Sequence, residues 1–323
     1  FVSGLGGIHG SIESEVVESN DEFIIVDLDV TSYYPNLAIT NGFYPAHLGK
    51  EFVSIYKHLF EQRKQYPKKS AESAMLKLAL NGVYGDSNNQ FSVFYDPQFT
   101  MSITLNGQLL LCLLAEGLMT IPGLRLIQVN TDGLTVQVPR THKVLVDLAR
   151  AAWQQRTGLN LEEAIYKSMM IRDVNNYIAV YEDGNTKRKG AYEWKALWHQ
   201  NAGGLVIPKV AEKVLVDGAP IRQTVETWPD IMDFMLRAKV PRSSHLQWGE
   251  EKVQNISRYY IAKGGKPLRK WMPPLKGKQE WRGIGIESGW GVQICNDIRD
   301  AGKLPVDFDY YVREVEKLCL SLA

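Results

Sequence analysis

The chain has 323 residues, of which 45% are hydrophobic and 23% are charged, values that are ordinary for a globular protein with two or three subdomains. No secretory leader is visible, and the most apolar stretch, Leu105 to Met119, is too short and too polar for a membrane span, so we predict a buried helix there. Cys112, Cys295 and Cys319 lack CxxC spacing, which favours reduced thiols in the cytoplasm over disulfides or a zinc site. The net charge of +1 does not by itself suggest a nucleic-acid partner.

The first predicted elements are a strand and a helical hairpin. Phe23 to Leu28 is rich in Ile and Val and predicts a buried strand that ends at Asp29. Lys50 to Tyr66 has the apolar spacing of a helix and stops before Pro67. Ser70 to Tyr84 is rich in Ala and Leu and predicts a second helix. The short connection between the two helices makes them a hairpin.

The middle of the chain predicts a platform of strands backed by a helix. Gln98 to Met119 reads as a long helix, and Leu124 to Val129 and Leu134 to Val138 read as two strands joined by a turn at Asn130 to Gly133. Val144 to Arg156 predicts an amphipathic helix. Such a platform can hold carboxylates side by side at its open edge.

The later part of the chain predicts a hairpin, then a mainly helical region. Asn176 to Tyr181 and Lys187 to Glu193 form the hairpin, and the helical pattern starts at about Asn201. A basic loop interrupts that region between Ala262 and Arg282. Its basic residues are Lys263, Lys266, Arg269, Lys270, Lys276, Lys278 and Arg282, against one acidic residue, Glu280.

This basic segment has the composition of a loop that binds phosphates. It holds Trp271 and Trp281 among several Gly and Pro residues, and clustered Lys and Arg supply the charge that a nucleic-acid backbone attracts. A solvated, flexible loop is the alternative interpretation.

Three short motifs carry the most specific information. They are Asp29-Val30-Thr31-Ser32-Tyr33-Tyr34-Pro35, then Lys77-Leu78-Ala79-Leu80-Asn81-Gly82-Val83-Tyr84-Gly85, then Asn130-Thr131-Asp132-Gly133. They resemble the DxxSLYP, KxxxNSxYG and DTDS signatures of the family B DNA polymerases, in the family's order. The resemblance implies an α+β right-hand polymerase with an antiparallel-sheet palm, helical-hairpin fingers and a mainly helical thumb. We expect palm at 1–48 and 87–199, fingers at 49–86 and thumb at 200–323.

The resemblance implies that Asp29 and Asp132 are the catalytic, metal-binding aspartates, with the backbone carbonyl of Val30 as a third ligand. The cofactor would be two Mg²⁺ ions, with Mn²⁺ as an alternative, because two cations can activate the attacking hydroxyl and neutralise the leaving pyrophosphate. Hard oxygen ligands suit Mg²⁺. For either aspartate taken alone, a helix cap or an Asx-turn is the competing interpretation.

A nucleotide site is expected beside this metal site. Lys77, Asn81 and Tyr84 stand at i, i+4 and i+7 and share one helix face. By resemblance, Lys77, Asn81 and Arg63 bind the incoming dNTP, and Tyr84 abuts the nascent base pair. Tyr34 would lie under the sugar and select deoxynucleotides. A solvated Lys and Arg on a helical hairpin is the alternative.

Primer and DNA contacts are expected further along the chain. Lys189-Gly190-Ala191-Tyr192 resembles, with looser spacing, the family's lysine-tyrosine motif, which implies that Lys189 and Tyr192 hold the primer. Lys263, Lys266 and Lys270 of the basic segment would bind DNA. The segment Gly4-Leu5-Gly6-Gly7 resembles the family's YxGG segment but lacks the Tyr.

The chain also departs from the family pattern. Asn130 replaces the first Asp of the third motif, and Gly82 replaces the Ser of the second. The motifs are spaced too closely for the insertions of protein-primed phage enzymes, and no 3′–5′ exonuclease domain precedes them. We expect that domain to be absent, separate or removed, and the chain to be phage- or plasmid-like.

These observations predict a DNA-directed DNA polymerase that transfers dNTPs to a primer 3′-hydroxyl by a two-metal reaction. Its partners would be primer-template DNA, dNTPs and a separate exonuclease chain or domain, without a membrane, in the cytoplasm of a bacterial or phage-infected cell. One alternative is a catalytically weak polymerase-like subunit that binds primer-template DNA and depends on a partner chain. Another, a polymerase that copies RNA, is disfavoured because its hairpin would carry two adjacent Asp residues.

Overall fold

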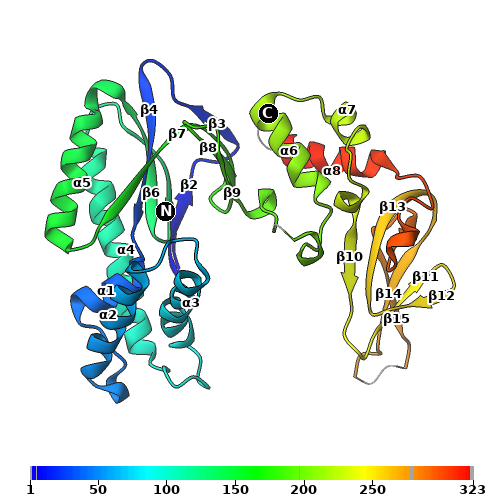
Figure 1. Cartoon of the computed structure of the whole chain (residues 1–323), viewed down its shortest axis with the longest axis horizontal. Helices are drawn as coiled ribbons and strands as arrows, with labels where there is room; N and C mark the ends of the chain where they lie inside the picture. Colours follow the sequence, from blue (N-terminus) through cyan, green and yellow to red (C-terminus); the bar gives the residue numbers. More distant parts are fainter. Residues whose placement is uncertain (1, 5, 196, 277–278, 321–323) are drawn as a thin grey trace. The chain divides into compact units, whose positions relative to one another are not determined.

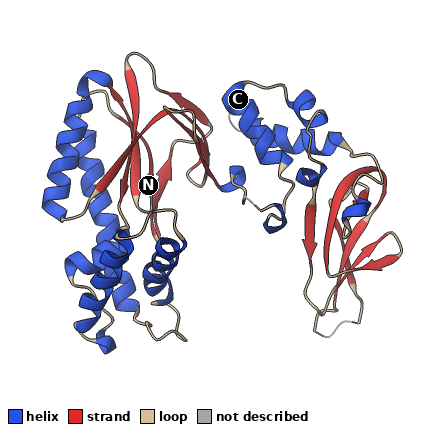
Figure 2. Ribbon diagram, viewed as in Figure 1, coloured by secondary structure: helices blue, strands red, loops and turns tan. Residues whose placement is uncertain are grey.

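The computed structural model describes residues 2–4, 6–195, 197–276 and 279–320. The chain divides into two compact units (Figures 1 and 2). The first contains residues 2–174 and 179–187, and the second contains residues 175–178 and those from 188 onward. Each unit is described separately below.

A large antiparallel sheet organises the first unit. Its strands are β1 (Val2–Gly4), β2 (Gly7–Ser11), β3 (Glu15–Glu18), β4 (Phe23–Val30), β5 (Arg125–Asn130), β6 (Gly133–Pro139), β7 (Leu161–Asp173), β8 (Asn176–Tyr181) and β9 (Thr186–Lys189). Their order is β1-β2-β5-β6-β4-β7-β8-β9, with β3 paired to β7. The centre of the sheet, β6-β4-β7, therefore brings together three segments far apart in sequence. The predicted antiparallel platform is confirmed.

The described residues of the first unit form the α-helices α1 (Tyr33–Asn41), α2 (Glu51–Lys64), α3 (Ala71–Asp86), α4 (Pro97–Met119) and α5 (Lys143–Thr157). The predicted helical hairpin is confirmed as α2 and α3, and the Ser70 hydroxyl caps α3 by accepting the Ser73 N–H at 3.1 Å. Helices α4 and α5 pack together, and the Trp153 indole donates to the Leu110 carbonyl at 2.8 Å. Figure 1 shows both helices beside the sheet.

Alternation along β4 gives the sheet two different faces. Val26, Leu28 and Val30 point into the hydrophobic core that also contains residues of α4 and α5. Asp27 and Asp29 occupy the intervening positions and so lie on the opposite face. The core thus fixes which side of the sheet carries the carboxylates.

Helix α4 is the one helix in the described part of the chain that is long and apolar enough to cross a membrane by length and composition. It packs much of its apolar surface in the core of the first unit, where Ile103, Leu111, Leu114 and Leu118 are buried. This packing is the ordinary reason for the apolar composition of a core helix.

The second unit corrects the prediction of a mainly helical region. It contains α6 (Val206–Asp217), α7 (Ile221–Glu226) and α8 (Phe308–Leu320), but also β10 (Leu236–Lys239), β11 (His245–Trp248), β12 (Glu251–Val253), β13 (Ile256–Lys266), β14 (Leu268–Met272), β15 (Arg282–Ile286) and β16 (Val292–Ile294). The strands form two antiparallel sheets, β10-β13-β16 and β12-β11-β14-β15. Except for β13, these strands have only three to five residues, too few for the alternation that would have revealed them from sequence.

The predicted basic loop is largely strand as well. Its first part belongs to β13, the stretch from Leu268 to Met272 is β14, and Arg282 begins β15. Lys278 lies outside the described residues. The predicted second strand of the earlier hairpin is also shorter than expected, because Gly190–Tyr192 forms a 3₁₀ turn.

Candidate active site

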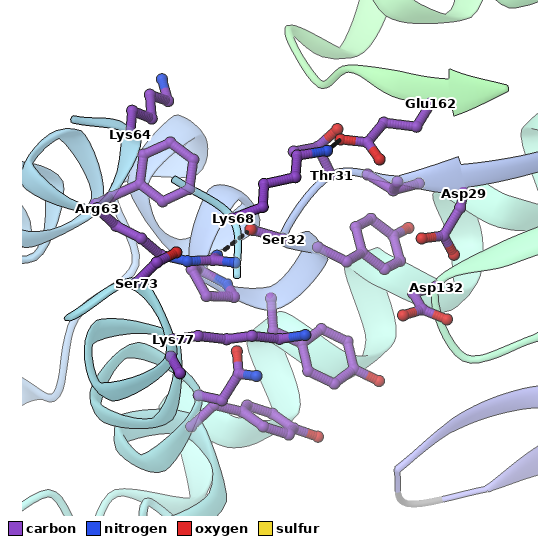
Figure 3. A pocket seen from close by; sticks show the side chains of 18 of the residues that line it. Asp29, Thr31, Ser32, Arg63, Lys64, Lys68, Ser73, Lys77, Asp132 and Glu162 are labelled. Atoms are coloured by element: carbon purple, nitrogen blue, oxygen red, sulfur yellow. Dashed lines mark hydrogen bonds and ion pairs between the residues drawn. The ribbon is translucent and has the colours of Figure 1, made fainter. Parts of the chain in front are cut away.

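A cavity of about 750 Å³ in the first unit brings the three sequence motifs together. It is lined by Asp29, Val30, Thr31, Ser32, Tyr33, Tyr34, Pro35, Phe60, Arg63, Lys64, Tyr66, Lys68, Ser73, Ala74, Lys77, Asn81, Tyr84, Thr131, Asp132 and Glu162. Figure 3 shows the acidic side chains Asp29 and Asp132 across the cavity from the cationic Arg63 and Lys77. The cavity therefore has one acidic wall on the sheet and one basic wall on α2 and α3.

The acidic wall is built by the register of the central strands. Asp29 near the end of β4 lies opposite Gly133 of β6 and opposite Glu162 of β7. Asp132 occupies the turn just before Gly133, and its carbonyl accepts the Val30 N–H at 2.7 Å. Hydrogen bonding thus fixes the backbone of Asp132 next to the strand that carries Asp29.

Ionisation of Asp29 is unfavourable in the acidic wall, because the carboxyl is partly desolvated and lies near the negative charge of Asp132. The Asp29 carboxyl reaches the cavity and is exposed there, yet most of its surroundings are protein. This desolvation, followed by the negative charge of Asp132, raises the pKa of Asp29 to about 7. The Lys187 ammonium acts in the opposite direction on this pKa. A cation at this wall would offset the repulsion between the carboxylates.

A buried hydrogen-bond network lies behind Asp29. The buried carboxylate of Asp27 accepts from the Thr135 hydroxyl at 2.6 Å, from the Tyr166 hydroxyl at 2.6 Å and from Lys187 Nζ at 3.2 Å. Lys187 also donates to the Tyr166 hydroxyl at 3.1 Å. Sequence reasoning missed this network, although Asp27 stands two positions before Asp29 and shares its sheet face.

The turn between β5 and β6 is organised by its own side chains. Asn130 Oδ1 accepts the Thr131 N–H at 2.9 Å, and Thr131 Oγ1 lies 2.8 Å from His9 Nε2 of β2. The amide that replaces an acid in the third motif thus orders the turn. His9, which contacts Thr131 of this turn, is a further residue near the site that the sequence did not indicate.

The chain bends sharply between β4 and α1. Ser32 adopts a left-handed conformation with φ 48°, which is uncommon for a residue other than glycine. Its hydroxyl accepts from Arg63 Nη1 at 2.9 Å (Figure 3), so α2 is tied to this bend. Arg63 Nε is buried and has no hydrogen-bond partner among the described residues.

The predicted helix face of α3 is present. Lys77 and Asn81 are exposed to the cavity, and Tyr84 lies one turn further along. The ring of Tyr84 packs 4.3 Å, centroid to centroid, from the ring of Tyr34, and its hydroxyl lies 2.9 Å from Thr104 Oγ1. The Tyr34 hydroxyl donates to the Gly6 carbonyl. The structure therefore groups these four residues at one cavity wall, and the Gly6–Gly7 segment lies against it.

An ion pair at this cavity was not anticipated from the sequence. Lys68, in the connection between α2 and α3, lies 3.0 Å from Glu162 of β7 (Figure 3). Both side chains are largely exposed, so the pair contributes about 0–1 kcal/mol to stability.

The predicted primer and DNA contacts lie in the second unit. Lys189 is exposed at the end of β9, whereas Tyr192 is fully buried and donates its hydroxyl to the Leu318 carbonyl at 3.0 Å. Lys263 is exposed. Lys266 pairs with Glu251 at 2.7 Å and lies over the Trp248 ring, and Lys270 is half-buried. DNA contacts by these residues stay predictions, and the burial of Tyr192 favours a packing role for its ring.

The donor set at the acidic wall suits a hard divalent cation. Asp29 and Asp132 supply carboxylate oxygens, and Val30 lines the same cavity. The described residues contain no group of three or more His, Cys, Asp or Glu placed to hold a metal ion. Mg²⁺ is commonly bound by one or two carboxylates together with substrate phosphates, so the residues present fit that ion better than a zinc ion.

Comparison with known proteins supports the fold. A scan against protein-family models found no match, and a search of curated proteins by sequence found none either. Among solved structures, the chain is similar to the family B DNA polymerase from the hyperthermophilic archaeon Pyrobaculum calidifontis, with a TM-score of 0.55 and 18% sequence identity. The similarity covers 97% of this chain and 46% of the archaeal chain, so this chain spans less than half the length of that polymerase. At this identity the likeness concerns the fold alone and supports a polymerase-like architecture.

Proposed function

We propose that this chain is a DNA-templated DNA polymerase that adds dNTPs to a primer 3′-hydroxyl with the help of divalent cations. The observation that carries the proposal is the cavity itself, where Asp29 and Asp132 face Arg63 and Lys77. The four residues come from three separate parts of the chain. Their convergence on one cavity is what a reaction between a primer hydroxyl and a nucleoside triphosphate requires.

The roles follow from the chemistry of each wall. Asp29 and Asp132 would hold Mg²⁺, which supplies the activation of the hydroxyl and the neutralisation of the leaving group. Arg63 and Lys77 would hold the triphosphate, because both side chains line the cavity across from the carboxylates. The Tyr34–Tyr84 pair would form the floor under the sugar and base.

A primer-extension assay with all four dNTPs and Mg²⁺ tests the proposal. The wild-type chain should extend a labelled primer, and Asp29→Asn and Asp132→Asn should each abolish extension while leaving primer-template binding largely intact. Asp21→Asn is the matched control, because Asp21 is exposed just before β4, away from the cavity end of that strand. Near-normal turnover in the Asp29 or Asp132 variant would refute the site assignment.

A polymerase-like subunit without activity of its own is the competing function. In that case every one of these variants would bind primer-template DNA with the affinity of the wild type, and the wild type itself would not extend the primer. The same assay therefore separates the two functions.

A further inference from the structure

The small sheet β12-β11-β14-β15 of the second unit presents aromatic rings and cations on one face. In its register His245 lies opposite Trp271, and Trp271 lies opposite Gly283. Residues directly opposite one another in antiparallel strands share a face. By the same pairing, this face, here named the stacking face, consists of His245, Gln247, Lys252, Arg269, Trp271, Gly283 and Gly285.

The other face of this sheet is buried at its centre and exposed at its β15 edge, where Arg282 and Ile284 lie. Leu246 and Leu268 belong to it and are almost completely buried, and the indole of Trp248 on the same side donates to the Val292 carbonyl at 2.8 Å. The stacking face is therefore the side turned away from the core of the second unit.

The rings on the stacking face are close together and partly open. The rings of His245 and Trp271 are nearly parallel, at 15°, with centroids 6.4 Å apart. Trp281, just before β15, has its ring centroid 5.3 Å from that of His245 and is 46% exposed. A Cβ on Gly283 would lie 3.0 Å from the Trp271 ring, so this ring lies across the β15 backbone. The Ser288 side chain lies against Gly285 in the same way, so both glycines of β15 are sites of close approach.

The charges of the stacking face have one sign. Lys252 and Arg269 are exposed on it, and the strand residues described on this face include no carboxylate. Glu251 lies on the opposite face, where it pairs with Lys266 at 2.7 Å. The surface combines aromatic rings with cations, and the described strand residues on it include no negative charge that would repel a phosphate.

We propose that the stacking face binds single-stranded nucleic acid, with unpaired bases stacked on Trp281 and His245 and with phosphates held by Arg269 and Lys252. Stacking needs the faces of bases, which a duplex hides between its own base pairs. The further assignment of this strand as unpaired template rests on the proposed function, whereas the binding itself does not.

The proposal also changes which basic residues matter. The sequence singled out Lys266 and Lys270, but Lys266 is neutralised by Glu251, and Lys270 lies opposite Leu246 on the inward face. Arg269, between Leu268 and Lys270, points outward instead because side chains alternate along β14.

Binding of a fluorescein-labelled oligothymidylate of about twelve nucleotides, followed by anisotropy, tests the surface. Trp281→Ala should weaken binding at least about fivefold, and Trp281→Phe, which keeps a ring, should restore most of it. Arg269→Ala should weaken binding and flatten the slope of log affinity against log salt by about 0.7. Arg282→Ala is the matched control, since Arg282 is an equally exposed arginine on the opposite face of the same sheet, and it should bind like the wild type.

A photocrosslink separates this surface from the cavity of the first unit. An oligothymidylate with one 5-iodouracil should crosslink to a peptide that contains Trp281, Trp271 or His245. The proposal is overturned by crosslinks confined to the first unit, by unchanged affinity in Trp281→Ala, by equal effects of Arg269→Ala and Arg282→Ala, or by tighter binding of a duplex of the same length. Primer extension measured on the same preparations distinguishes the two proposals. If Trp281→Ala weakens binding but the wild type does not extend a primer, only the proposed polymerase function is refuted. If the wild type extends a primer but Trp281→Ala binds normally, only the proposed stacking face is refuted.

Discussion

A Cβ atom on Gly133 would lie 3.0 Å from Asp29 Oδ1 and 2.5 Å from the Leu28 carbonyl oxygen, because β4 and β6 set Asp29 and Gly133 directly opposite one another. Contacts this short force the strands or the carboxylate to move. Gly133 can therefore not be replaced by a residue with a Cβ atom without a shift of β4 or of the Asp29 carboxylate.

Gly133→Ala should lower activity although it adds only a methyl group. Overpacking at such a contact costs about 1–3 kcal/mol, and here the groups that must move are the β4 backbone at Leu28 and the Asp29 carboxylate. We expect extension to fall at least about tenfold, equivalent to about 1.4 kcal/mol in the barrier, with primer-template affinity retained. Gly117→Ala is the control for the loss of a glycine, because Gly117 is exposed near the end of α4, has no positive φ, and an added Cβ there would have nothing within 4 Å. Full activity of Gly133→Ala would mean that Asp29 does not need its present position.

Asn130→Asp should be tolerated. The Asn130 side-chain oxygen accepts the Thr131 N–H at 2.9 Å, and a carboxylate keeps that acceptor while adding negative charge beside Asp132. Extension measured across a Mg²⁺ titration should equal or exceed that of the wild type at the low end. Asn130→Ala is the paired variant, because it removes the acceptor and should destabilise the turn by about 1 kcal/mol. Inactivation by Asn130→Asp would reveal a role that only the amide can fill.

Asp27→Ala should destabilise the first unit far more than the loss of an exposed carboxylate. Asp27 is buried and accepts from Thr135, Tyr166 and Lys187, so its removal leaves donors without their acceptor. Breaking a buried pair of this kind costs about 3–5 kcal/mol. Urea denaturation should show this loss.

Asp147→Ala is the control for that measurement. Asp147 pairs with Lys143 at 2.6 Å but is about half exposed, and such pairs contribute about 0–1 kcal/mol. Equal stability of the two variants would show that the Asp27 network does not hold the sheet together.

The elements that carry the site could be predicted because their signals are local. The run from Phe23 to Leu28 is a buried strand by composition, and Ser70 is a helix cap by residue type. Helices α2, α3, α4 and α5 all begin and end within a few residues of their predicted limits. The convergence of Asp29 and Asp132 was inferred from the resemblance, and the β4–β6 register now gives it a physical basis.

What sequence reasoning missed depends on contacts distant in the chain. Lys187 donates a hydrogen bond to Asp27, which lies 160 positions away in the sequence, and the residues next to either one do not indicate this contact. Six of the seven strands described in the second unit have only three to five residues, which is too short for an alternating pattern to be recognised. The basic segment was recognised by its charge, but only the β11–β14 register shows that Arg269 faces outward and Lys270 inward.

Lys77→Ala and Arg63→Ala should each raise the KM for dNTP and lower kcat, with little effect on primer-template affinity. Both residues line the cavity opposite Asp29 and Asp132, Arg63 tied to Ser32 at 2.9 Å and Lys77 exposed on α3. A charge-assisted contact to a phosphate is worth about 1.5–3 kcal/mol, so kcat/KM should fall about 10- to 100-fold.

The double variant tells whether both cations hold one ligand. If Lys77 and Arg63 bind the same triphosphate, the double loss in kcat/KM should be smaller than the sum of the single losses in free energy. Lys57→Ala is the matched control, because Lys57 is an exposed lysine of α2 that does not line the cavity. Strict additivity would assign the two cations to different ligands. A loss of DNA binding with an unchanged KM for dNTP in Lys77→Ala would place α3 at the nucleic-acid surface instead of the nucleotide site.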